Sequence, residues 1–340
     1  MNDQSRKKGQ PAEPPRRRES TKELARALQR AERMIETEDI DDAIEYLEDL
    51  FTRHPANTDV LDQLCRAYFK VGDLISYRMT AAQLLELEPD DPVRMADAAM
   101  AMLLRGLKVK PYRLFKRLIT LHPDHDMVEF SREITRRLEG SIFDLADRPD
   151  LPAEERFKLA EMYDEAQELL DAEEYAKAER KITGLLRELP DSLPALSCLS
   201  QIQTTRGRLT EALATTGRIL ERTPDEVATL ALRTRVLYLL GEREEALACA
   251  ERLKATQPQS PGPGLEKLTA LTFLGDDEGV LEAFDPIRRM CEDEGPEFTW
   301  VAGMIHHLAG VAAWRLGRKS EALQHWRRAT KLTPGHPLAE

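Results

Sequence analysis

Residues 190–224 read PDSLPALSCLSQIQTTRGRLTEALATTGRILERTP, and this stretch contains the pattern that decides the fold. It begins at Pro190 and ends at Pro224, and Gly207 stands 17 residues from each of them. Proline does not continue a helix, and glycine readily takes the left-handed conformation that follows a helix end. The stretch therefore predicts two helices of similar length that are joined by a glycine turn.

The same pattern recurs along the chain with a period of 34 residues. Between the turn residues, apolar side chains follow one another at helical spacing, as Leu61, Leu64 and Tyr68 do. The chain is therefore expected to be all-α and built from repeated helix-turn-helix units. The prolines of the pattern are Pro55, Pro89, Pro123, Pro190, Pro224 and Pro258, and the glycines are Gly72, Gly106, Gly140, Gly207, Gly241 and Gly275.

In these units the chain resembles the tetratricopeptide repeat family, whose unit is a helix-turn-helix of 34 residues. The family places a small residue at the twentieth position and a large apolar residue at the twenty-seventh. Positions are counted from unit starts at residues 24, 58, 92, 159, 193, 227, 261 and 303. The twentieth position holds Ala43, Tyr77, Ala178, Ala212, Ala246 and Ala322, of which Tyr77 departs from the family, and the twenty-seventh holds Leu50, Leu84, Leu118, Leu185, Ile219, Leu253 and Ile287. The resemblance implies a right-handed α-α superhelix, a solenoid whose concave face is lined by the first helix of each unit.

Two interruptions divide the pattern. Pro149 and Pro152 stand where a second helix is expected, so residues 141–158 are interpreted as an irregular break or hinge. This places an N-terminal array at 24–140 and a C-terminal array at 159–336. Residues 291–300 add about eight positions to a unit, and they either lengthen a helix or form a loop.

Charge divides the chain into a basic tail and an acidic body. Residues 1–20 carry six basic and three acidic side chains, so this predicted disordered tail has a net charge of +3 and leaves −15 on the body, out of −12 in total. An acidic body repels phosphate, which makes nucleic acid an unlikely partner. The tail is interpreted as solvated, with a contact to RNA, acidic lipid or an acidic protein surface as the alternative.

The N-terminal sequence and the apolar runs bear on location. Residues 1–21 contain no Leu, Ile, Val or Phe, so no signal peptide is expected. No apolar run approaches the roughly 20 residues that a membrane span needs. The predicted location is the cytoplasm.

No motif for catalysis is found. The sequence has no glycine-rich phosphate loop, no metalloprotease motif and no nucleophile elbow. The four cysteines are far apart in sequence, and His122 and His125 lack a third ligand for a metal. We therefore expect no enzyme activity, no cofactor and no metal site.

Binding of a protein is the function that remains. The resemblance implies that particular positions of each first helix face the concave groove and contact an extended peptide or a partner helix. The positions that would hold a chaperone's C-terminal carboxylate, such as Leu28, Gln63 and Val93, are not cationic, so that specific role is rejected. The predicted groove residues are Arg66, Phe69, Lys70, Tyr163, Gln167, Gln201, Thr205, Arg235, Tyr238, His307, Trp314 and Arg315.

The predicted function is a non-catalytic scaffold or adaptor for a protein partner. The alternative is a regulatory subunit that senses a peptide or small ligand and controls a separate enzyme, with closure at the break. The last helix leads to a further expectation, because no capping helix follows it. Leu323 and Trp326 are candidates for a homodimer or partner contact, unless Trp326 packs inside its own unit.

Overall fold

The structure, a computed structural model, describes residues 21–37, 40–294 and 298–333. Over these residues the chain forms 17 α-helices and no β-strand, so the predicted all-α class is confirmed. The helices are α1 (Thr21–Glu36), α2 (Ile40–Arg53), α3 (Thr58–Val71), α4 (Leu74–Leu87), α5 (Pro92–Leu103), α6 (Val109–Leu121), α7 (Val128–Leu145), α8 (Ala153–Asp171), α9 (Tyr175–Glu188), α10 (Leu193–Thr205), α11 (Leu209–Arg222), α12 (Val227–Leu240), α13 (Arg243–Ala255), α14 (Pro261–Leu274), α15 (Asp277–Glu294), α16 (Thr299–Arg315) and α17 (Lys319–Leu332).

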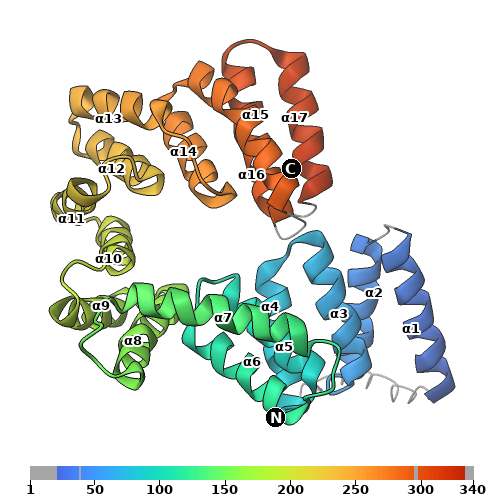
Figure 1. The fold of residues 1–340 in the computed structure, drawn as a ribbon. Helices are drawn as coiled ribbons and strands as arrows, with labels where there is room; N and C mark the ends of the chain where they lie inside the picture. Colours follow the sequence, from blue (N-terminus) through green and yellow to red (C-terminus); the bar gives the residue numbers. More distant parts are fainter. Residues whose placement is uncertain (1–20, 38–39, 295–297, 334–340) are drawn as a thin grey trace, which may run out of the picture.

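The helices pack in chain order. Each helix contacts the next, and the first helices of successive units also contact one another, as α12 does with α14 and α14 with α16. Figure 1 shows the helix pairs following one another around a curve, with α12, α14 and α16 on its inner side. This is the arrangement of a solenoid, in which each unit buries its apolar face against its neighbours.

Local sequence explains where a typical helix begins and ends. Before α3, the side chain of Asn57 accepts a hydrogen bond from the amide of Val60 at 2.9 Å. After α3, Gly72 takes a φ of 75°, which satisfies the end of the helix without a Cβ clash. Inside the pairs, small residues such as Ala212 and Ala246 are fully buried, which lets two helices approach closely.

One glycine of the repeat pattern does not form a turn. Gly106 and Gly207 have positive φ, but Gly140 lies inside α7, and the helix continues to Leu145. The expectation that Gly140 closes a first helix is therefore wrong. The physical reason lies in the next residues, since Ile142 and Leu145 are buried and continue the apolar face of α7.

The predicted break is short in the structure. Helices cover 141–145 and 153–158, so irregular backbone is limited to residues 146–152. Pro152 directly precedes α8, where its missing amide costs no helical hydrogen bond. The division of the chain into two separate domains stays a prediction.

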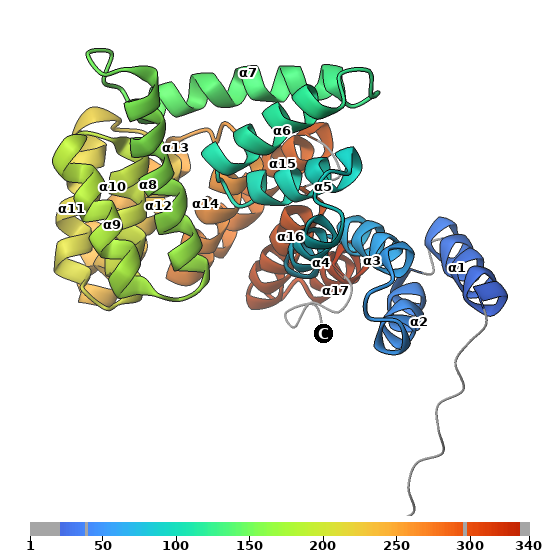
Figure 2. The same ribbon diagram turned by 90° about the horizontal axis from the view of Figure 1, so that it is seen from below.

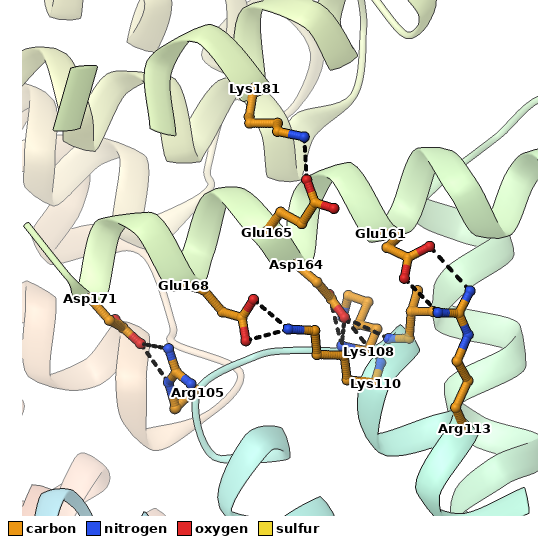
Figure 3. A network of polar contacts seen from close by, with 11 residues as sticks. Arg105, Lys108, Lys110, Arg113, Glu161, Asp164, Glu165, Glu168, Asp171 and Lys181 are labelled. Atoms are coloured by element: carbon orange, nitrogen blue, oxygen red, sulfur yellow. Dashed lines mark hydrogen bonds and ion pairs between the residues drawn. The ribbon is translucent and has the colours of Figure 1, made fainter. Parts of the chain in front are cut away.

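Ion pairs between α6 and α8 cross this junction (Figure 3). Lys110 of α6 contacts Glu168 of α8 at 2.6 Å, and Arg113 contacts Glu161 at 2.5 Å. Four cationic side chains lie in α6 and a fifth, that of Lys108, directly precedes it, whereas α8 presents carboxylates. The two helices therefore have complementary charges where the arrays meet.

A buried carboxylate holds the start of α6. Asp164 of α8 is fully buried, and it accepts hydrogen bonds from the amide nitrogens of Lys108 at 2.9 Å and Val109 at 2.7 Å. These amides have no partner inside α6, because they belong to its first turn. Asp164 thus acts as the N-cap that the residue before α6 does not supply.

The solenoid curls so far that its two ends meet. Figures 1 and 2 both place α16 beside α3 and α4. The contact is made by Gly72 and Trp300: a methyl group on Gly72 would lie 3.5 Å from Cβ of Trp300. The array is therefore nearly closed into a ring.

Residues 291–294 of the late unit lengthen a helix, which was one of the two expectations, whereas residues 295–297 lie outside the described residues. The helix α15 extends to Glu294 and includes Pro286 in its interior. The predicted tail, residues 1–20, lies outside the described residues. So do the residues of the predicted C-terminal array from 334 onward. Within the described ranges, no helix combines the length and the apolar character that crossing a membrane requires.

Candidate functional site

A pocket on the inner side of the curve gathers three of the predicted groove residues. Gln201 and Thr205 of α10 and Arg235 of α12 line a hollow of about 310 Å³. The neighbouring first helix α14 contributes Glu266. The remaining lining residues are Ser197, Thr204, Ala228, Thr229 and Leu232. We call this hollow the α10–α12–α14 pocket.

Most polar groups of the pocket are uncharged. Arg235 is paired with Glu266 at 3.1 Å, so the two charges compensate each other. The hydroxyl of Thr204 donates to the carbonyl of Ser200. Gln201 and Thr205 are exposed, and within the described part of the chain their side chains form no hydrogen bond. The pocket therefore offers an amide and a hydroxyl that can both donate and accept.

The position of each helix explains why these side chains meet. The helices α10 and α12 are both first helices and contact each other, and α12 contacts α14. A helix repeats its face every three to four residues, so Gln201 and Thr205 lie on one face of α10. Stacking of the units then brings that face next to Arg235 of α12.

Two of the predicted aromatic residues lie near the ends of first helices, Tyr238 in α12 and Trp314 in α16. The ring of Tyr238 contacts the ring of Phe273 edge to face, with centroids 5.1 Å apart. The ring of Trp314 lies 5.7 Å from that of Trp326. Both Tyr238 and Trp314 remain substantially exposed.

Two other predicted residues belong to α16. Arg315 donates to the carbonyl of Thr272 at 2.9 Å and approaches Asp277 at 3.4 Å, so it links α16 to the α14–α15 turn. His307 is half-buried on α16, away from the α10–α12–α14 pocket. Neither residue is part of that pocket.

The predicted residues of α3 contact their own array. Lys70 donates to the carbonyl of Ile35 at 2.9 Å, at the end of α1. Phe69 packs against Tyr77 with ring centroids 5.1 Å apart. Arg66 lies 3.8 Å from Glu32 and is half exposed. Arg66 and Lys70 are both exposed, whereas Phe69 is half-buried.

Tyr163 and Gln167 form an internal pair on α8. The amide of Gln167 donates to the phenol oxygen of Tyr163 at 2.6 Å. Burial raises the pKa of Tyr163 to about 12, so the phenol stays neutral. These two residues are not brought into the α10–α12–α14 pocket.

The predicted terminal contact involves residues with different surroundings. Leu323 on α17 is 47% exposed. The indole of Trp326 lies over Gly310 of α16, where an added methyl group would approach Nε1 to 2.4 Å. Trp326 thus contacts its own helix pair and is itself half-buried, and the outward contact through Leu323 and Trp326 stays a prediction.

A larger hollow of about 570 Å³ lies at a different edge, between the ends of α12, α13 and α14. Two of its polar side chains are already engaged: Glu226 accepts from the amide of Thr229, and Arg252 donates to the carbonyl of Pro224. These bonds cap and link helix ends. The α10–α12–α14 pocket is the better candidate because it gathers three of the predicted groove residues.

A family model matches part of the chain. The model of the tetratricopeptide repeat matches residues 163–227, from the middle of α8 to the first residue of α12. Residues 163–227 are thus similar to tetratricopeptide repeats. The matched segment contains the side chains that α10 contributes to the α10–α12–α14 pocket.

Several solved structures are similar to this chain at low identity. The P58(IPK) TPR domain is 14% identical, with 93% of this chain and 95% of that chain covered and a TM-score of 0.34. Yeast Tom70 is 14% identical, covering 94% and 87%, with a TM-score of 0.43. The Cut9-Hcn1 hetero-tetramer of the APC/C is 13% identical, covering 92% and 61%, with a TM-score of 0.45. A search of curated proteins finds no match.

Some residues of the site were not predicted. Ser197 stands four residues before Gln201 on the same face of α10, so helical spacing could have found it. Glu266 stands on α14, where no groove residue was predicted. Phe273 belongs to the unit after Tyr238, and its contact with that ring follows only from the stacking of α12 on α14.

A pair of histidines is the other notable cluster. Nδ1 of His306 lies 3.1 Å from Nδ1 of His325, and both rings contact Phe284. Burial lowers the pKa of His306 to about 4 and also lowers that of His325. Among the described residues, no group of three or more His, Cys, Asp or Glu side chains is arranged to hold a metal ion.

Proposed function

We propose that this chain is a non-catalytic scaffold that binds an extended peptide, or a helix, of a partner protein on its concave face. Tetratricopeptide repeats are generally protein-protein interaction modules. The observation that carries the proposal is the α10–α12–α14 pocket, where Gln201, Thr205 and Arg235 gather in one hollow.

The chemistry of this pocket suits a peptide backbone. An extended peptide presents both amide donors and carbonyl acceptors that need partners when they are buried. The amide of Gln201 and the hydroxyl of Thr205 can satisfy either kind of group. Arg235 can exchange its bond to Glu266 for a carboxylate of the partner, and such an exchange favours a peptide that carries an acid at this point.

The geometry of the junction favours a scaffold over a regulatory subunit. A ligand-driven closure at residues 146–152 would require α8 to move relative to α6. The ion pair of Lys110 with Glu168 and the cap supplied by Asp164 oppose that movement. A scaffold function needs no such movement.

Affinity capture from the native cell extract tests the proposal. The full chain is compared with the double variant Gln201→Ala/Arg235→Ala, and bound proteins are identified by mass spectrometry. We expect a partner that the double variant retains at least about tenfold less, which corresponds to about 1.4 kcal/mol of binding free energy.

A matched control replaces an exposed residue of an outer helix, Glu221→Ala on α11. This variant should capture the same partner in the same amount as the unmodified chain. If the folded double variant captures every protein that the unmodified chain captures, the concave pocket is not the binding site.

A further inference from the structure

A row of exposed aromatic side chains follows one edge of the C-terminal units, where the first helices end. Tyr238 of α12, Phe273 of α14 and Trp314 of α16 are 37, 44 and 49% exposed. The first two rings are in contact. Trp314 belongs to the next first helix, and Arg315 beside it is bonded to the carbonyl of Thr272, which precedes Phe273. We call this row the aromatic edge.

The two ends of the aromatic edge have opposite charge. Beyond Tyr238, the turn into α13 exposes Glu242, Glu244 and Glu245, and none of these carboxylates has an ion-pair partner among the described residues. At the other end, Nζ of Lys319 lies 5.6 Å from the ring centroid of Trp314. A ligand that fits the whole edge is apolar in the middle, cationic toward α13 and anionic toward α17.

The chain itself contains a segment with this order of groups. Residues 11–18 read PAEPPRRR, with Glu13 before two prolines and three arginines after them. Proline-rich segments favour the polyproline II conformation and bind to rows of aromatic side chains. The arginines can also stack on an aromatic ring such as that of Tyr238 while they pair with carboxylates.

The lengths agree. Eight residues in the polyproline II conformation span about 22 Å, at about 3.1 Å per residue. Neighbouring packed helices lie about 8–10 Å apart, so the distance from α12 to α16 across α14 is about 20 Å. Residues 11–18 can therefore extend from Trp314 to the acidic turn after Tyr238.

We propose that residues 11–18 of one copy of the chain bind the aromatic edge of a second copy. The segment cannot reach its own edge, because only Glu19 and Ser20 separate Arg18 from α1, which allows about 7 Å. Both views place α1 and α12 at opposite ends of the molecule (Figures 1 and 2). Each copy carries one segment and one edge, so the contact is heterologous and joins copies head to tail.

Sedimentation velocity of the purified full chain tests this inference, without any partner protein. At low ionic strength the average mass should rise with protein concentration above the 38.7 kDa of one chain. The association should weaken at least about tenfold in Arg16→Glu/Arg17→Glu/Arg18→Glu and in Phe273→Ala, and it should fall with added salt. A chain that stays monomeric up to several hundred micromolar overturns the proposal.

Two further variants make the test specific. Arg6→Glu/Lys7→Glu/Lys8→Glu changes the tail charge by the same amount outside the segment and should leave association intact. Glu242→Lys/Glu244→Lys/Glu245→Lys should lose association alone and regain it when mixed with the Arg16–Arg18 variant. Failure of this exchange, in variants whose circular dichroism shows them to be folded, overturns the proposal.

A self-association through the last helix would give a different result. In that case Leu323→Ala would abolish the association and Phe273→Ala would leave it unchanged. The peptide-binding function is tested with variants of the α10–α12–α14 pocket, so failure of one idea leaves the other in place.

Discussion

The carboxylate of Asp164 accepts a hydrogen bond from the amide nitrogen of Val109 at 2.7 Å, although 55 positions of the chain separate the two residues. The first turn of α6 is therefore completed by a side chain of α8. Because α8 follows the irregular residues 146–152, the stability of α6 depends on the position of a helix beyond them.

Replacement of Asp164 by alanine should lower the free energy of unfolding by about 2–3 kcal/mol, since it leaves buried amides without an acceptor. Urea titration followed by circular dichroism measures the change. Glu165→Gln is the matched control on the same helix, because the Glu165–Lys181 pair is largely exposed and should contribute less than about 1 kcal/mol. Equal effects of the two variants would contradict the capping role.

Asp97 on α5 should make the chain less stable as the pH rises from about 4 to about 6. Burial, with a smaller effect from the nearby Asp62, raises the pKa of Asp97 from 3.8 to about 6. In this range the unfolded chain releases the proton of Asp97 before the folded chain does. The free energy of unfolding therefore falls as the pH rises. Asp97→Asn should remove the loss and stabilise the chain at pH 7.5 by at most about 3 kcal/mol. An unchanged pH profile of urea stability in Asp97→Asn would contradict this prediction.

The pair of His306 and His325 has the opposite pH dependence. Their lowered pKa values mean that the unfolded chain takes up protons first as the pH falls below about 6.5. Arg288 and Arg328 also disfavour a charged His306, whereas Glu292 favours it. Stability of the last helix pair should fall by about 2 kcal/mol between pH 7 and pH 5.

Tryptophan fluorescence measures this effect selectively, because the three tryptophans of the chain, Trp300, Trp314 and Trp326, all lie in α16 and α17. Urea titrations at the two pH values give the difference in stability. His325→Phe keeps an aromatic ring and removes one titrating group, so it should reduce the difference. The same difference in this variant would show that other groups cause it.

Two glycine substitutions should change the free energy of unfolding in opposite directions. In Gly310→Ala the methyl group would lie 2.4 Å from Nε1 of Trp326, so the indole must move, at a cost of about 1–3 kcal/mol. Gly140 lies inside α7, and a methyl group added there would meet no atom within 4 Å outside the backbone of its own helix. Gly140→Ala should therefore stabilise the chain by about 0.5–1 kcal/mol. Thermal unfolding measures both, and a red-shifted tryptophan emission should accompany only the first.

The helix pattern was predictable from the sequence because its causes are local. The proline and glycine spacing places a unit start at residues 193 and 227, where α10 and α12 begin. Gly140 shows the limit of this reasoning. Its spacing fits the pattern, but the buried side chains of Ile142 and Leu145 continue the helix, and burial depends on packing rather than on spacing.

The candidate site was predictable only in part. Repeat positions indicated Gln201, Thr205 and Arg235, which the structure brings together in one pocket. They gave no indication that Lys70 would bind a carbonyl of α1, because a flexible side chain chooses its partner in the folded state. For the same reason, the bond between Asp164 and Val109 could not be found from a pattern that repeats every 34 residues.

The contact of Gly72 with Trp300 has a consequence for the kinetics of binding. A partner segment with a free end can thread into a nearly closed ring, whereas a segment between two folded domains must wait until the ring opens. Opening separates this contact, so it costs free energy each time. Segments between two folded domains should therefore bind more slowly than chain termini of the same sequence. Widening the gap at the contact of Gly72 with Trp300 would accelerate only the binding of these internal segments.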